Sequence, residues 1–343
     1  MQILIRKMII TKEEITTLFS KFNSSCVLVI GDVMVDSYLI GKVDRISPEA
    51  PVPVVALQQR INMLGGAANV ALNIKSLGAK AILCSVIGND KQGDELLHLM
   101  KKEGLKTDGI IRSNERITTT KFRIISNRMQ MLRVDEEIDS ELNLKDSGEL
   151  LVSISNLIAT QKPDAIILQD YNKGILSPGV IEKISGLAGK AGIPVAVDPK
   201  KKNFTAYSGI TLFKPNLKEI SEGLKTEIDP LSIESLQKAA EILHVSQDIQ
   251  LIMITLSEHG VFISSKHPSG PVSTIIPAAV RSIADVSGAG DTVISVAALC
   301  MAAKINPVFM AMLSNLAGGL VCEQSGVVPV DKTRLMEEAF AEL

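Results

Sequence analysis

The sequence predicts an α/β fold in which a mostly parallel central sheet is covered by helices on both faces. Several short apolar runs contain almost no polar residue, which is typical of strands that are buried on both sides. Helix-length amphipathic segments alternate with these runs along the chain. Polar residues follow the runs at their carboxyl ends, which is where sheets of this class bind ligands.

The composition narrows the class of protein. The chain has 343 residues, 46% of them hydrophobic, and a formal net charge of −2. The absence of long basic runs and of tryptophan argues against a nucleic-acid partner. Cys26, Cys84, Cys300 and Cys322 lie far apart in apolar stretches, as expected for reduced core thiols of a cytoplasmic protein. Neither the first ten residues nor any apolar run suits a signal peptide or a membrane span, so no membrane partner is expected.

The first part of the chain predicts a strand, an excursion and a helix. The strand 26–30 ends at Asp32. Three prolines within 38–57 exclude a helix there and fit two extended pieces outside the main sheet. A helix is expected to open with Gly65-Gly66, whose small size allows either a ligand or a packed strand to approach the backbone. Asn69 favours the ligand, because a packing face has little use for an amide one turn into a helix.

Residues 117–135 predict a second excursion. Two segments rich in β-formers flank a short polar turn, which is typical of a hairpin. Lys121, Arg123 and Arg133 occupy alternate positions, so one face of the hairpin can be basic. A basic face suits an anionic ligand, but an ordinary solvated strand face explains the same pattern.

From residue 144 onward, strands and helices alternate regularly. The helices are expected near 144–160, 178–189, 231–243 and from 217, and the buried strands near 165–168, 194–197, 211–214 and 251–254. A polar residue follows each of these strands, namely Asp170, Asp198, Asn216 and Thr255. Packing requires nothing polar at these positions, so they predict a binding site along one edge of the sheet.

The stretch Asp285-Val-Ser-Gly-Ala-Gly-Asp291 precedes a strongly apolar helix. A turn through Gly288, Ala289 and Gly290 can point several N–H groups the same way, and the helix adds its positive end. Such a turn suits phosphate. Asp291 would repel a bound phosphate, unless it accepts the proton of an attacking hydroxyl while the amides hold a phosphoryl group in transfer. A glycine-rich turn that merely caps a core helix is the alternative.

Four motifs together resemble the ribokinase-like (PfkB) family of carbohydrate kinases over nearly the whole chain. They are Gly31-Asp32, residues 65–71, residues 216–219 and residues 285–291. Four further stretches, 31–36, 45–54, 170–174 and 198–200, are similar to the subgroup that phosphorylates a heptose 7-phosphate. The threonine that often follows the first aspartate of the last motif is Val286 here, which leaves the second aspartate in place.

The resemblance implies a single kinase domain over 1–343 that uses ATP and Mg²⁺, and it assigns roles to site residues. Asp291 would be the base on an anomeric hydroxyl, with the amides of Gly288, Ala289 and Gly290 as donors to the phosphoryl group. Mg²⁺ would be held, through water, by Asn216 and Glu219. The nucleotide contacts would come from Asn216, Leu217, Lys218, Glu219, Thr255, Ser257, Gly260 and Asn315. Sugar contacts would come from Asp32, Gly65, Gly66 and Asn69, with Asp170 and Asp198 as further candidates. Whether a monovalent cation assists is left open.

The resemblance also implies a β-sheet lid over the sugar, formed by 38–57 and 117–135, through which two subunits pair as a homodimer. A sugar that already carries a phosphate needs a cationic pocket. The candidates for binding that phosphate are Lys121, Arg123, Arg133, Lys173 and Lys200, with Arg45 as another.

Three other functions stay open. The first is a kinase of another sugar phosphate, such as fructose phosphate. The second is a sugar-binding sensor without catalysis, although Asp291, Asn216 and Glu219 argue against it. A dinucleotide-dependent oxidoreductase is the third, and it lacks the required glycine pattern after the first strand.

Overall fold

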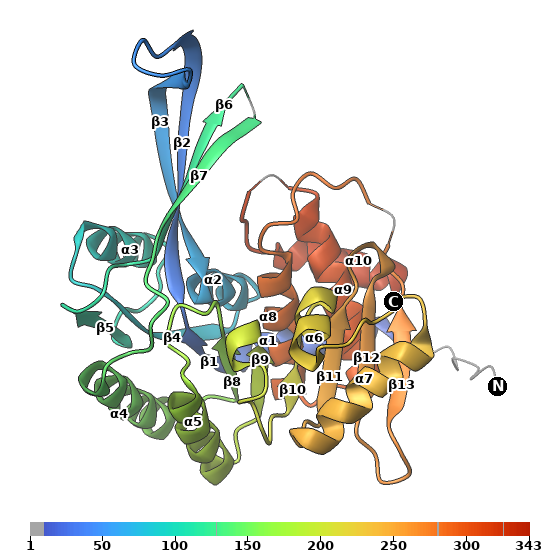
Figure 1. Ribbon diagram of the computed structural model, residues 1–343. Coiled ribbons are helices and arrows are strands. Elements are labelled where there is room, and N and C mark those ends of the chain that lie inside the picture. The colour runs from blue at the N-terminus through green and yellow to red at the C-terminus, as the bar shows by residue number, and fades with distance from the viewer. Residues whose placement is uncertain (1–9, 128, 280, 325) are drawn as a thin grey trace.

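The computed structural model describes residues 10–127, 129–279, 281–324 and 326–343, so the first nine residues, part of the segment considered for a signal peptide, lie outside it. Its centre is a nine-stranded sheet of order β13-β12-β11-β10-β9-β8-β1-β4-β5 (Figure 1). The strands from β11 to β5 in this order are parallel, and β12 and β13 join antiparallel. The predicted, mostly parallel α/β sheet is therefore confirmed. The strands are β1 Cys26–Gly31, β4 Lys80–Gly88, β5 Ile110–Ser113, β8 Ala165–Gln169, β9 Val195–Asp198, β10 Leu212–Phe213, β11 Leu251–Thr255, β12 Val261–Ser265 and β13 Val272–Ile276.

Helices cover both faces of this sheet, as predicted. Val27 and Val29 of β1 point into one hydrophobic core, and Leu28 and Ile30 point into the other. This alternation explains why the strand is apolar at every position. The first core packs against α1 Lys12–Ser24, α2 Ala67–Ser76, α3 Lys91–Lys102, α8 Ala289–Ala302, α9 Pro307–Cys322 and α10 Lys332–Glu342. The second packs against α4 Leu144–Gln161, α5 Pro178–Ala191, α6 Leu217–Leu224 and α7 Ile233–Ser246.

A separate four-stranded sheet, which we call the lid, projects from the body beside the carboxyl edge of the main sheet (Figure 1). Its strands are β2 Val33–Ile46, β3 Pro53–Gly66, β6 Thr120–Ser126 and β7 Met129–Glu136. The strand order is β3-β2-β6-β7, with β2 antiparallel to β3 and parallel to β6. Both predicted excursions thus join one small sheet.

The predicted boundaries differ from the structure where pairing overrides local sequence. The helix expected to open at the glycine pair begins only at Ala67, because Leu64–Gly66 continue β3 and pair with Val33–Val35. β5 begins only at Ile110, after a turn in which the Ile110 N–H donates to the Thr107 carbonyl.

The four cysteines are buried free thiols, as predicted. In the part of the chain that the structure describes, none of the helices has the length and apolar character needed to cross a bilayer.

Candidate active site

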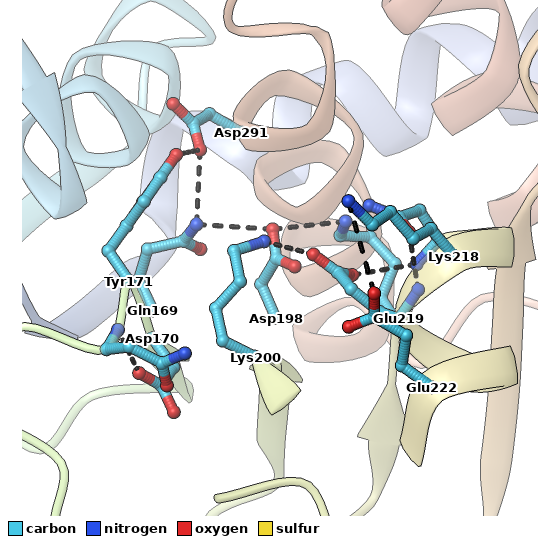
Figure 2. A network of polar contacts seen from close by, with 12 residues as sticks. Gln169, Asp170, Tyr171, Asp198, Lys200, Lys218, Glu219, Glu222 and Asp291 are labelled. Carbon is cyan, nitrogen blue, oxygen red and sulfur yellow. Dashed lines mark hydrogen bonds and ion pairs between the residues drawn. The ribbon is translucent and has the colours of Figure 1, made fainter. Parts of the chain in front are cut away.

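The base candidate, Asp291, lies in the first turn of α8, and this turn sits on the carboxyl edge of the main sheet (Figure 2). A Cβ at Gly290 would be only 3.9 Å from Asp198 Oδ2 at the end of β9. Gln169, the last residue of β8, donates its amide both to Asp198 Oδ2 (3.2 Å) and to Asp291 Oδ1 (3.1 Å). The edge predicted from polar strand ends is therefore where three segments, α8, β8 and β9, meet.

Three side chains donate hydrogen bonds to the Asp291 carboxylate. Asn69 Nδ2 bonds Oδ2 at 2.7 Å, while the Tyr171 hydroxyl and the Gln169 amide bond Oδ1 at 2.7 and 3.1 Å. Asp291 is only 5% exposed. Burial raises its pKa to about 6, although the Asn69 and Tyr171 hydrogen bonds act in the opposite direction. A carboxylate with this pKa is ionised at neutral pH and is a stronger base than an exposed aspartate.

The glycine turn before Asp291 provides the expected amide donors. Gly288 caps α8 with a φ of 83°, which favours glycine, and a side chain there would crowd Asn69. Gly288 has no side chain to accept the N–H groups of the first turn of α8. The Ala289 N–H donates to the Val286 carbonyl at 3.3 Å, and Gly290 directly precedes the base in the chain. The alternative of a capped core helix also describes α8, whose residues are mostly buried, but it does not account for the contacts of Asp291.

Asp32 is brought to the same edge, in a different role from the one predicted. Its two oxygens accept the backbone N–H groups of Tyr171, Lys173 and Ile175, at 2.8 to 3.1 Å. Asp32 is 1% exposed, and burial raises its pKa to about 6. With both oxygens bonded to backbone, Asp32 fixes the loop after β8, and we correct its assignment as a sugar contact accordingly.

Asp170 likewise supports this loop from behind. Its carboxylate accepts hydrogen bonds from Asn203 and Tyr207 in the second core and from the backbone of Asn172. In Figure 2 it points away from Asp291. The structure thus gives Asp170 a scaffolding position in place of the predicted substrate contact.

Asp36, which sequence reasoning did not single out, stands against Gly65, one of the residues predicted to contact a sugar. It follows Val35 in β2 and is 4% exposed. A Cβ at Gly65 would come within 2.3 Å of Asp36 Oδ2, so glycine is needed at 65 to admit this carboxylate. Gly66 has a φ of 62°, and a Cβ there would come within 2.4 Å of the Asp32 carbonyl oxygen. Asp36 stands in the 31–36 stretch that carries the family resemblance, which was the signal available for finding it.

The basic residues predicted to bind the phosphate of the sugar fall into two groups, of which the first lies near Tyr171, Asp36 and the loop after β8. Lys121 of β6 and Lys200 place their ammonium groups 5.7 and 5.5 Å from the Tyr171 ring centroid. Arg123 pairs with Asp36, and Lys173 pairs with Glu137 at 2.7 Å. Two of these four side chains, Lys121 and Lys200, thus lie beside Tyr171, and the other two are paired with carboxylates.

The other two candidate phosphate ligands, Arg133 and Arg45, lie farther out on the lid. Arg133 faces Arg123 across β6 and β7, but its half-exposed side chain pairs with Asp135 at 3.0 Å. Arg45 is exposed, nine residues beyond Asp36 along β2, which corresponds to about 30 Å of strand. The structure does not bring Arg45 to the site of its own chain.

Asn216 and Glu219 form the start of α6 next to this edge. Asn216 Oδ1 accepts the Glu219 N–H at 2.8 Å, and Glu219 Oε2 accepts the Asn216 N–H at 2.9 Å, which is a capping box. Glu219 Oε1 pairs with Lys200 (Figure 2). Although burial lowers the pKa of Lys200, the carboxylates of Asp198 and Glu219 raise it above its usual value.

The Glu219 and Asp198 carboxylates are hard oxygen donors of the kind Mg²⁺ prefers. No cluster of three His, Cys, Asp or Glu side chains in the described ranges has metal-binding geometry. The carboxylates of Glu219 and Asp198 already take part in a helix cap and in ion pairs, so they do not form a closed cage around a metal. They suit a magnesium ion that keeps its water ligands. Leu217 and Lys218 follow in the first turn of α6, and the exposed Lys218 side chain points toward Glu222.

The other nucleotide candidates lie farther along the same edge. Thr255 at the end of β11 forms a bridge with Asn216, and exposed Ser257 begins the short helix η2 Ser257–His259. A Cβ at Gly260 would fall 2.0 Å from the Ile276 carbonyl, so strand packing already requires this glycine. Asn315 of α9 donates to the Pro277 carbonyl at 2.9 Å.

Sequence reasoning missed three members of the central network. Gln169 bridges Asp291 and Asp198, Tyr171 bonds Asp291, and Lys214 forms a buried ion pair with Asp198 at 3.1 Å. Each ends a buried strand or directly follows one, which was a usable signal. Lys214 belongs to the predicted strand 211–214 but lies just beyond β10, where it neutralises Asp198.

Comparison with known proteins agrees with this arrangement. The sequence matches the pfkB family of carbohydrate kinases over residues 25–334. It is 39% identical over 322 residues to a protein of Caulobacter sp. (strain K31) named bifunctional protein HldE, covering 94% of this chain and 64% of that protein. For the Caulobacter vibrioides protein of the same name, identity is 41% over 315 residues, covering 92% and 63%. The chain therefore spans less than two thirds of the length of these relatives.

Solved structures share the fold at low identity. Phosphofructokinase-2 of Escherichia coli in complex with potassium superposes with a TM-score of 0.74 at 18% identity, covering 92% of this chain and 98% of that one. The ribokinase of Thermotoga maritima gives 0.66 at 20% identity, covering 93% and 100%.

A helix start that presents amides beside a buried carboxylate, on the edge of a parallel sheet, defines a phosphotransferase of the ribokinase-like fold. The chain belongs to the pfkB family of carbohydrate kinases, and it is an ATP-dependent sugar kinase.

Proposed function

We propose that this kinase phosphorylates the anomeric hydroxyl of D-glycero-β-D-manno-heptose 7-phosphate, giving the 1,7-bisphosphate on the route to ADP-heptose and lipopolysaccharide core. The observation that carries the proposal is the buried Asp291 carboxylate between the amides of α8 and a basic sugar side. The stretches 31–36, 45–54, 170–174 and 198–200, which resemble the heptose 7-phosphate kinase subgroup, support the choice of sugar.

In the proposed reaction, Asp291 accepts the proton of the anomeric hydroxyl. The sugar oxygen then forms a bond to the γ-phosphorus of ATP while the bond to the ADP oxygen breaks. An anomeric hydroxyl is more acidic than an ordinary alcohol, so a carboxylate with a pKa of about 6 is sufficient as the base. The amides of Gly288, Ala289 and Gly290 donate to the phosphoryl oxygens as charge moves across them. Mg²⁺, held through water near Asn216 and Glu219, would offset charge on the ATP phosphates.

Lys121 is the strongest candidate for the phosphate that the sugar already carries. Burial lowers the pKa of Lys121, although the nearby carboxylates of Asp36 and Asp135 act in the opposite direction. Its ammonium group lies 5.7 Å from the centroid of the Tyr171 ring, whose hydroxyl bonds the base. A phosphate in front of Lys121 would supply a further counter-charge.

Lys121→Ala should therefore raise KM for the sugar phosphate about tenfold with a smaller change in kcat, because a partly desolvated ion pair is lost. Lys42→Ala is the control, since Lys42 is an exposed lysine farther along the lid that pairs with Asp44. An unchanged KM in Lys121→Ala would remove Lys121 from the phosphate site.

One experiment tests the substrate. The protein is incubated with ATP, Mg²⁺ and heptose 7-phosphate, beside fructose phosphates and unphosphorylated sugars, and the product is identified by ³¹P NMR. The expected product is the heptose 1,7-bisphosphate. Preferential phosphorylation of another sugar phosphate would replace the proposed substrate, and phosphorylation of none would favour a sensor.

We also propose that two subunits pair through the lid and that the protein works in the cytoplasm, where ATP and sugar phosphates occur. The lid exposes large apolar side chains unusual for a free surface, such as Leu57 (53% exposed) and Leu132 (58%). Light scattering should give twice the chain mass for the protein, and a charged residue at either position should lower it. A monomeric mass for the unaltered protein would contradict the pairing.

A further inference from the structure

Tyr171 occupies an unusual position between the lid and the base. Its hydroxyl donates to Asp291 Oδ1 at 2.7 Å, and its ring centroid lies 5.7 Å from the ammonium group of Lys121 on the lid and 5.5 Å from that of Lys200 on the body. Figure 2 shows the side chain reaching up from the loop after β8 to the carboxylate. One residue therefore bonds the base and lies close to one lysine of the lid and one of the body.

The hydrogen bond of Tyr171 competes with any hydroxyl that approaches Asp291 through Oδ1. Asp291 Oδ2 is engaged by Asn69, and Oδ1 is engaged by Gln169 and Tyr171. An oxygen that already accepts two donors has little capacity for a third. For a substrate hydroxyl to give its proton to Oδ1, one of these donors has to leave.

Of the three donors, Tyr171 is the one that can leave by side-chain rotation alone. Asn69 is buried in α2, and Gln169 is buried at the end of β8, where it also holds Asp198. Tyr171 is partly exposed on the loop, and Asp32 fixes its backbone N–H but not its ring. Rotation of a partly exposed side chain is fast and costs little compared with moving a strand end or a helix.

We propose that the Tyr171 hydroxyl shields the base: it occupies the place of the acceptor hydroxyl at Asp291 until a sugar enters and displaces it. While the bond is intact, a water molecule cannot take the same place. ATP bound without sugar is thereby protected from hydrolysis by a water molecule at Oδ1, the step in which the water oxygen bonds to the γ-phosphorus, the bond to the ADP oxygen breaks and the proton passes to Asp291. The inference rests on the proposed role of Asp291 as the base.

The first test is ATP hydrolysis in the absence of sugar. Tyr171→Phe keeps the ring but removes the hydroxyl, so phosphate release should rise about tenfold, a fraction of the roughly 10²–10⁴ that a positioned base contributes. The matched control is Tyr207→Phe, which removes a phenol hydroxyl bonded to the buried Asp170 at 2.8 Å, away from the base. It should leave hydrolysis at the level of the unaltered protein. Adding Asp291→Asn to Tyr171→Phe should abolish the gain.

The second test follows the phenol directly. The chain has 3 tyrosines and no tryptophan, so tyrosine emission can be observed without interference. A phenol bonded to a carboxylate emits weakly, so displacement of Tyr171 should increase the emission. We expect this increase on adding, without ATP, whichever sugar phosphate the protein phosphorylates. Tyr171→Phe should lack the increase, and Tyr207→Phe should keep it.

The outcomes separate this inference from the substrate proposal. No rise in hydrolysis for Tyr171→Phe overturns the shielding role, whatever the sugar. If tyrosine emission does not change when a sugar shown to be a substrate is added, Tyr171 is not displaced. If Tyr171→Phe loses kcat at unchanged KM, Tyr171 is a positioning residue that stays bonded to Asp291. Failure to phosphorylate heptose 7-phosphate changes only the proposed substrate, because the hydrolysis test uses no sugar.

Discussion

Two buried aspartates at the same sheet edge, Asp32 and Asp291, have different roles. Burial raises the pKa of each to about 6. Asp32 accepts only backbone N–H groups, whereas Asp291 accepts only side-chain donors, from Asn69, Gln169 and Tyr171. Backbone donors in a folded loop cannot be exchanged for a ligand, but a side-chain donor can. A raised pKa is therefore common to both carboxylates. The type of hydrogen-bond donor distinguishes Asp32, which holds the loop, from Asp291, the candidate base.

The largest effect is expected on the catalytic rate when Asp291 is replaced. Asp291→Asn removes the base while retaining the shape, so kcat should fall by about 10²–10⁴. Asn69 can still donate to the oxygen of the new amide and the Tyr171 hydroxyl can accept from its nitrogen, so of the three hydrogen bonds only the one from Gln169, at 3.1 Å, is lost. Steady-state kinetics and thermal unfolding should show an inactive but folded protein. Retention of kcat within a few-fold would remove Asp291 from the role of base.

A smaller effect is expected at Asp32, in stability. Asp32→Asn places an NH₂ group against backbone N–H donors that cannot reverse, so at least one donor is left unpaired. The free energy of unfolding should fall by about 1–3 kcal/mol, measured by urea denaturation at pH 7. Asp291→Asn is the matched control and should show no comparable loss. Equal stabilities for the two variants would remove the distinction between them.

The smallest expected effect is a dependence of kcat/KM and of stability on pH. Since the base must be ionised, kcat/KM should fall as the pH drops through about 6, by about tenfold per pH unit below it. Stability should change in the opposite direction. The folded-state pKa of Asp291 lies above its model value of 3.8, so its contribution to stability is fully present below about pH 4 and is lost as the pH rises through about 6.

Asp291→Asn lacks this titration. Its unfolding free energy relative to the unaltered protein should therefore be higher at pH 8 than at pH 4, by at most about 3 kcal/mol. Parallel melting curves of the two proteins across this range would contradict the raised pKa.

The strand–helix alternation and the glycine turn were predictable because both are local patterns. The buried strands β1, β8, β9 and β11 are apolar at nearly every position, and each ends close to where the sequence predicts. The start of α2 was less predictable. Its position depends on the pairing of Leu64–Gly66 with Val33–Val35 in β2, about thirty residues earlier, and no local preference encodes that pairing.

The sequence by itself determined the fold class, the edge that holds the site, and the identity of Asp291 as the base candidate. Only the tertiary structure decided that Asp32 and Asp170 hold a loop and that Asp36 stands against Gly65. It also placed Tyr171 on the base. The physical reason is that hydrogen-bond partners at this edge come from distant segments, 120 residues apart for Tyr171 and 222 apart for Asn69. Folding selects among the many pairs of polar side chains that such an edge could bring together.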